Sequence, residues 1–123
     1  MAHRYLRMAV EQSPDLEQYK SWVKAEIRRG DPSDIAAAGR GLSAFDARDF
    51  AGDIDVPTTV VITARDRLIR PVRQRELAKA VPGAGVVEVD GAHNAWLVRP
   101  KEFNDAVGDA LSTVASPPGP SAR

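Results

Sequence analysis

The sequence predicts an α/β fold with parallel strands, and three observations support this prediction. Residues 58–63 are β-branched at every position, the pattern of a strand that is covered on both faces. Helical periodicity follows from Pro71, and a second valine-rich stretch follows at residues 85–89. A strand, a helix and a second strand in this order are typical of a parallel sheet with helices on its faces.

Two helices are expected before the first strand. Ser13 and Pro14 form a helix start, and Gly30 ends that helix after apolar residues at three-to-four spacing, which are Leu16, Tyr19, Val23 and Ile27. Asp31 and Pro32 begin a second helix with an apolar face made of Ile35, Ala38, Leu42 and Phe45. A charged connector at residues 46–55 then leads to the first strand, with Phe50 as its expected anchor.

The remaining elements are bounded by proline and glycine. Pro71 begins a helix that ends at Pro82 and Gly83, and the residues expected to face the sheet are Val72, Leu77, Ala78 and Val81. Residues 90–99 are predicted to be a loop. A last helix starts at Pro100 with an apolar face of Phe103, Val107, Leu111 and Val114. The proline-rich residues 116–123 are predicted to be a disordered tail.

Composition excludes several classes of function. The 123 residues are 43% hydrophobic and 28% charged, which is typical of one globular domain or part of one. Equal numbers of basic and acidic residues, 17 each, show no electrostatic signature for nucleic acid or a membrane surface. With no cysteine and two histidines, we expect no metal and no cofactor. The absence of a signal peptide and of a long apolar run predicts a cytoplasmic protein.

Asp66 and His93 are the candidate site residues, because each follows a predicted strand. The carboxyl ends of parallel strands meet at one edge of a sheet, where α/β proteins place their chemistry. Histidine is the side chain best suited to move protons near neutral pH, and a nearby carboxylate can orient it. The alternative interpretation is that Asp66 caps the following helix and that His93 is an ordinary loop residue.

Three stretches carry a resemblance to a known family. The sequence PTTVVIT at residues 57–63, ARDRLIRP at 64–71 and GAH at 91–93 resembles the closing part of an α/β-hydrolase. The resemblance implies the C-terminal part of that fold: a helical lid-like segment at residues 1–45 and the core at 46–115, followed by the tail. The chain departs from the usual pattern at Thr63, where the family has glycine, and at Arg70, where it has proline.

The resemblance implies that Asp66 is the acid and His93 the base of a catalytic triad, with the two side chains within hydrogen-bond distance of each other. The family's nucleophile lies on a G-x-S-x-G motif ahead of both residues, and this motif is absent from the sequence. Ser43 comes nearest, but Phe45 stands where the motif needs glycine. We therefore expect a truncated, incomplete triad that is inactive alone. When a nucleophile-bearing segment completes the triad, we expect the protein to hydrolyse an ester, an amide or a related small molecule.

Two other functions remain open. The chain is a binding or assembly module if its exposed sheet edge recruits a second copy or a partner chain. It is a nucleophile-free hydrolase if Asp66 and His93 act as a general base on water. Trp96 is interpreted as an anchor for the His93 loop, with the wall of a substrate pocket as the alternative. The arginines near Asp66 are interpreted as a solvated face and are Arg65, Arg67, Arg70, Arg73 and Arg75.

Overall fold

The computed structural model describes residues 14–115. The chain divides into two compact units, residues 1–46 and residues 47–123. The first unit is helical, and the second contains the two strands and the candidate residues. No helix in residues 14–115 combines the length and the apolar character that a bilayer crossing requires.

The first unit contains the 3₁₀ helix η1 (Pro14–Tyr19) and two α-helices, α2 (Lys20–Arg29) and α3 (Pro32–Ala44). The prediction of one continuous α-helix from Pro14 is wrong at its start. Tyr19 has φ −96° and ψ −4° and no side-chain capping bond, so regular α geometry begins only after it. The predicted start of the next helix is confirmed: the Asp31 side chain accepts a hydrogen bond from the Ser33 N–H at 2.7 Å.

The expected apolar faces of this unit are covered only in part. Leu16 is buried, but α2 and α3 contain no buried residue. Leu42 is 76% exposed and Phe45 is 66% exposed, so the apolar face predicted for this helix is left largely uncovered. A periodic apolar face shows which side of a helix can be buried, and only a neighbouring element decides whether it is.

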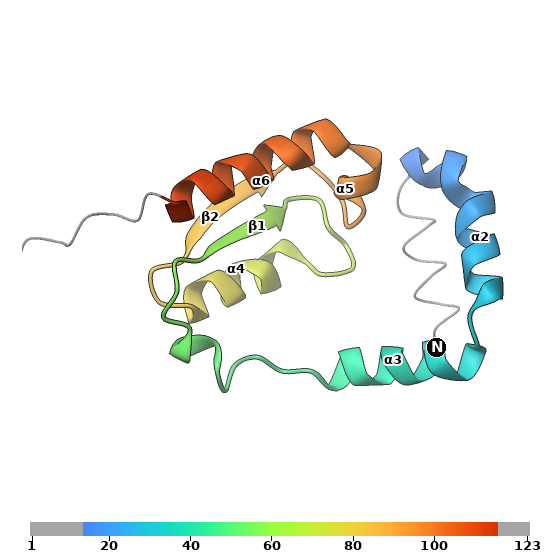
Figure 1. Cartoon of the computed structure of the whole chain (residues 1–123), viewed down its shortest axis with the longest axis horizontal. Coiled ribbons are helices and arrows are strands. Elements are labelled where there is room, and N and C mark those ends of the chain that lie inside the picture. The colour runs from blue at the N-terminus through green and yellow to red at the C-terminus, as the bar shows by residue number, and fades with distance from the viewer. Residues whose placement is uncertain (1–13, 116–123) are drawn as a thin grey trace, which may run out of the picture. The chain divides into compact units, whose positions relative to one another are not determined.

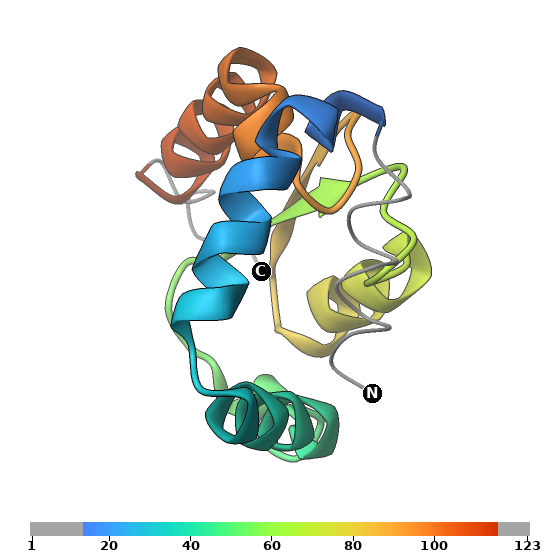
Figure 2. The same cartoon turned by 90° about the vertical axis from the view of Figure 1, so that its right-hand side faces the viewer.

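The second unit is built on two parallel strands, β1 (Thr59–Thr63) and β2 (Gly85–Val89). Their register pairs Thr59 with Gly85 at one end and Thr63 with Val89 at the other, as predicted for strands in parallel. Helix α4 (Pro71–Ala80) connects them and lies on one face of the sheet, and α6 (Pro100–Ala115) lies on the other (Figures 1 and 2). The predicted α/β fold class is therefore confirmed.

The core of this unit uses smaller residues than expected. Ile62 is fully buried, whereas the rest of β1 is only half-buried, so the predicted full cover of both faces is wrong. Helix α6 contacts both strands and buries Ala106 and Ala110, while Leu111 is 61% exposed. Alanine lets a helix backbone approach the sheet closely, which a leucine at the contact would prevent.

Two further expectations about packing differ from the structure in part. Of the four residues expected to face the sheet from α4, Ala78 and Val81 are buried, whereas Val72 and Leu77 are exposed. In the connector, Phe50 is 48% exposed, and its neighbour Ala51 is buried at the start of the 3₁₀ helix η2 (Ala51–Asp53). In both places the small residue allows the close contact and the large one remains at the surface.

The predicted loop at residues 90–99 contains a short helix, α5 (Ala95–Val98). The carbonyl of Asn94 accepts hydrogen bonds from two N–H groups, those of Leu97 and Val98. The helix cannot continue because Pro100 disfavours helical geometry at the residue before it, and Arg99 has φ −136° and ψ 56°. The structure thus corrects this loop to one helical turn between the His93 segment and α6.

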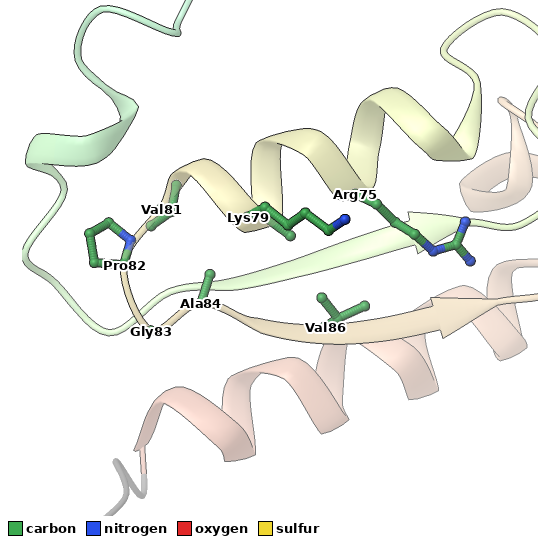
Figure 3. Close-up of a pocket in the computed structure, with 8 residues that line it drawn as sticks. Arg75, Lys79, Val81, Pro82, Gly83, Ala84 and Val86 are labelled. Carbon is green, nitrogen blue, oxygen red and sulfur yellow. The ribbon is translucent and has the colours of Figure 1, made fainter.

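A hollow of about 420 Å³ lies between the C-terminal half of α4 and the start of β2 (Figure 3). Its lining includes Arg75 and Lys79 from α4 and Val86 from β2. Asp66 and His93 are absent from the lining, because they follow the opposite ends of the strands. The hollow and the candidate residues are therefore separate features of this unit.

Candidate functional site

The loops that carry Asp66 and His93 are held together by an extension of the strand pairing. Thr63 and Val89 are the last paired residues of β1 and β2. Beyond them, the Ala64 N–H donates to the Val89 carbonyl at 3.0 Å, and the Arg65 N–H donates to the Gly91 carbonyl at 2.9 Å. The two loops therefore leave the same edge of the sheet side by side (Figure 1).

The Asp66 side chain is buried and organises its own loop. Its Oδ1 accepts hydrogen bonds from the N–H groups of Leu68 at 2.8 Å and Ile69 at 2.9 Å. The alternative role as a cap of α4 is not observed, since Arg70 is the N-cap residue and has no side-chain capping bond. Asp66 thus closes a tight turn before the helix, which fixes the direction of its second oxygen.

That second oxygen meets His93. Asp66 Oδ2 lies 2.9 Å from His93 Nδ1, which confirms the prediction that the two side chains reach hydrogen-bond distance. The Asp66 side chain is 3% exposed and that of His93 is 39% exposed. The pair is therefore anchored at its carboxylate end and open to solvent at its imidazole end.

The environment of Asp66 favours its ionised form. Burial acts to raise the pKa of this carboxyl group, but hydrogen bonds from His93 and from the N–H groups of Ile69 and Leu68 outweigh burial and lower it. An ionised carboxylate can only accept hydrogen bonds, so we assign the imidazole proton to Nδ1. The Nε2 atom of a neutral His93 then carries a free lone pair that can take up a proton.

Two residues at the site were not predicted from the sequence. The Thr63 hydroxyl lies 3.1 Å from Asp66 Oδ2, and Gln74 Nε2 lies 3.4 Å from the same oxygen. The sequence analysis noted Thr63 only as a departure from the usual glycine and did not consider Gln74. A signal was available, because a hydroxyl three residues before a loop aspartate can bond back to it.

Gly91 brings the His93 segment close to α5. A Cβ at Gly91 would lie 2.5 Å from the Cβ of Ala95, which is fully buried. Trp96 is 55% exposed, and its role as an anchor of this loop stays a prediction. The fully buried residue of the short helix is Ala95.

Three of the five arginines near Asp66 form ion pairs at the surface. Arg65 Nε lies 2.7 Å from Asp90, Arg73 pairs with Glu76 at 2.7 Å, and Arg75 pairs with Glu88. Side chains in all three pairs are about half exposed or more, so the pairs contribute little to stability. These three arginines match the interpretation as a solvated face.

The structure offers no nucleophile among the serines that it describes. All four of these serines lie within helices, and they are Ser21, Ser33, Ser43 and Ser112. The Ser43 hydroxyl donates to the Gly39 carbonyl at 2.8 Å, which confirms that this residue is part of a helix rather than of a strand-to-helix turn. Residues 14–115 also contain no group of three metal-ligating side chains.

Comparison with known proteins shows similarity to hydrolases. No protein-family model matches the chain. It is 40% identical over 63 residues to the putative carbamate hydrolase RutD of Azorhizobium caulinodans, covering 50% of this chain and 24% of that protein. It is also 40% identical over 67 residues to the putative RutD of Rhizobium rhizogenes, covering 54% and 26%. The matched stretch spans about a quarter of these curated relatives.

Solved structures are similar over most of the chain. An enol-lactonase from Burkholderia xenovorans LB400 superposes with a TM-score of 0.71 at 30% identity, covering 90% of this chain and 44% of the lactonase. A hydrolase from Pseudomonas aeruginosa PA01 has a TM-score of 0.58 at 20% identity, covering 91% and 51%, and this likeness concerns the fold alone. The chain thus corresponds to about half of each of these structures.

Proposed function

This chain has part of an α/β-hydrolase fold, and we propose that it supplies the acid, Asp66, and the base, His93, of a hydrolase's catalytic triad. The observation that carries the proposal is the 2.9 Å contact between Asp66 Oδ2 and His93 Nδ1. The carboxylate is buried and held by backbone N–H groups, and the imidazole is accessible. A general base needs both a fixed orientation and access to the group that it deprotonates.

In this mechanism His93 Nε2 removes a proton from a serine hydroxyl as the oxygen attacks a substrate carbonyl carbon. Asp66 holds the Nδ1–H tautomer and stabilises the imidazolium that forms, without taking up the proton itself. His93 then returns the proton to the leaving group. Carbamates and lactones, which appear in the names of the similar proteins, both have a carbonyl carbon bonded to a heteroatom. We therefore propose an ester, an amide or a related small molecule as the substrate.

The serine in this mechanism comes from a segment outside the present sequence, which contains no G-x-S-x-G motif. That segment is either joined to this chain or part of another one. We propose that it adds a strand beside β1, on the edge that faces away from β2. Backbone N–H groups alternate along a strand, so those of Thr59 and Val61 face this edge.

Complementation tests the proposal. The chain alone and the chain fused to a strand with a G-x-S-x-G turn from a similar hydrolase are assayed on short-acyl and long-acyl esters. We expect turnover only in the fused protein, with loss of turnover in His93→Ala. Turnover by the chain alone that depends on His93 would instead support the general-base mechanism on water. A folded fusion in which His93→Ala has full activity would contradict the catalytic assignment and favour the assembly module.

The same edge accounts for the partner that we propose. Without an added strand, a second copy can occupy the β1 edge, and we expect the isolated chain to associate with itself. Sedimentation over a range of concentrations checks this expectation, and fusion to the completing segment should suppress the association. A monomer at every concentration would contradict the proposed use of this edge.

A further inference from the structure

We propose that Gln74 is a positioning residue, which holds Asp66 in the orientation that His93 requires through the hydroxyl of Thr63. This inference rests on the proposed function, because it assigns to Gln74 a role in the same site. Gln74 lies in the first turns of α4, the helix that follows the Asp66 loop and contacts β1. Its side chain reaches across the base of that loop to residues at both loop ends.

The orientation of the Gln74 amide is determined by its backbone partners. Its Oε1 accepts a hydrogen bond from the Thr63 N–H at 2.9 Å. Its Nε2 donates to the Ile69 carbonyl at 2.6 Å. A backbone N–H can only donate and a backbone carbonyl can only accept, so rotating the amide by 180° would break both bonds. Gln74 therefore ties the last residue of β1 to the residue that closes the Asp66 turn.

The shorter of the competing contacts give the direction of the Thr63 hydroxyl, because Gln74 Nε2 also lies 3.4 Å from Asp66 Oδ2 and Thr63 Oγ1 also lies 3.4 Å from Gln74 Oε1. Gln74 Nε2 lies 3.0 Å from Thr63 Oγ1, and Thr63 Oγ1 lies 3.1 Å from Asp66 Oδ2. When Thr63 Oγ1 accepts from the amide, its own hydrogen is free to point at the carboxylate. The resulting order of donation runs from Gln74 to Thr63 and from Thr63 to Asp66.

These contacts complete the support of the carboxylate. Asp66 Oδ1 is held by N–H groups of its own loop, and Oδ2 lies between the Thr63 hydroxyl and His93 Nδ1. The Ala64 N–H bonds to β2, so the Thr63 N–H faces the opposite edge, where the Gln74 side chain takes the place of a neighbouring strand. Without Gln74, Thr63 would lose the partners of its N–H and of its hydroxyl oxygen.

The test is ¹⁵N NMR of the imidazole in the full chain, with His3→Gln so that His93 is the one histidine. At a pH where the imidazole is neutral, the ring nitrogen shifts report which nitrogen carries the proton. We expect a single Nδ1–H tautomer in this background. Gln74→Leu, which keeps most of the volume but no polar atom, should convert it to a mixture of both tautomers.

Three further variants separate positioning from folding. Thr63→Val keeps the shape of the side chain without the hydroxyl and should also give the mixture, whereas Thr63→Ser keeps the hydroxyl and should retain the single tautomer. Arg73→Leu is the matched control, because Arg73 is the exposed neighbour of Gln74 on α4. If Gln74→Leu does not fold, the two Thr63 variants decide the question.

The positioning role would be overturned if folded Gln74→Leu kept the single Nδ1–H tautomer. If Gln74→Leu does not fold, the same result in Thr63→Val would overturn it. Either result would leave the proposed function intact. A mixture of the two tautomers in the His3→Gln background, with Gln74 unchanged, would instead contradict the hydrogen bond between Asp66 and His93. The two proposals can therefore fail separately.

Discussion

The carboxylate of Asp66 and the imidazole of His93 come from positions 27 residues apart and meet with 2.9 Å between Oδ2 and Nδ1. The parallel register brings the ends of β1 and β2 together, and backbone hydrogen bonds extend this alignment into both loops. The carboxylate end of the pair is buried and held by backbone N–H groups, and the imidazole end is open to solvent. This asymmetry supports the base role that we propose for His93.

Asp66→Asn should abolish activity in the completed enzyme while leaving the fold nearly intact. The asparagine carbonyl can still accept from the loop N–H groups, but its amide would donate to Nδ1 and move the imidazole proton to Nε2. The wrong tautomer costs a triad enzyme about 10⁴-fold in turnover. Ester kinetics and a thermal melt of the same sample measure the two effects, and an active Asp66→Asn enzyme would remove this residue from the catalytic assignment.

The stability of the chain should depend on Asp66 in acid. In the folded state the pKa of this carboxyl group lies below its ordinary value of 3.8, so its ionised form stabilises the fold. That contribution is fully present above pH 3.8 and is lost as the pH falls through the lower pKa of the folded state. Urea unfolding at several pH values should show the difference between wild type and Asp66→Asn shrinking below pH 3.8. A difference that stays constant into strong acid would contradict this.

Gly91→Ala should destabilise the segment that carries His93. The new Cβ would lie 2.5 Å from the buried Ala95 Cβ, so α5 or the loop must shift. Overpacking of this kind costs about 1–3 kcal/mol. Gly108→Ala on α6 is the control, because a Cβ there meets nothing within 4 Å and alanine favours the helix. Equal unfolding free energies for the two variants would show that the Gly91 contact is unimportant.

Ile62→Ala should cost more than any other truncation in β1. Ile62 is the one large side chain in residues 14–115 that is fully buried, and removing its outer atoms leaves a cavity between the sheet and its helices. Such a change costs about 2–5 kcal/mol. Val86→Ala on β2 is the control, with a side chain that is 48% exposed. Denaturant unfolding measures both, and a loss below 1 kcal/mol for Ile62→Ala would contradict the described core.

Strand order and parallel pairing could be predicted from the sequence, because β-branched runs and proline positions are local signals. The contact between Asp66 and His93 was expected from the resemblance to an α/β-hydrolase. Burial could not be predicted in the same way. Leu111 and Leu77 lie on periodic faces yet are exposed, since alanines make the close contacts instead. The role of Gln74 could not be predicted either, because it depends on hydrogen bonds between residues 11 positions apart in the sequence.

The most direct test of the central claim is the labelling rate of the completed protein with a fluorophosphonate, which reacts with a serine only when a base activates it. The account predicts stoichiometric labelling of the G-x-S-x-G serine in the fusion, and a large loss of rate in both His93→Ala and Asp66→Asn. Equally fast labelling in a folded His93→Ala fusion would contradict the claim that this chain supplies the base.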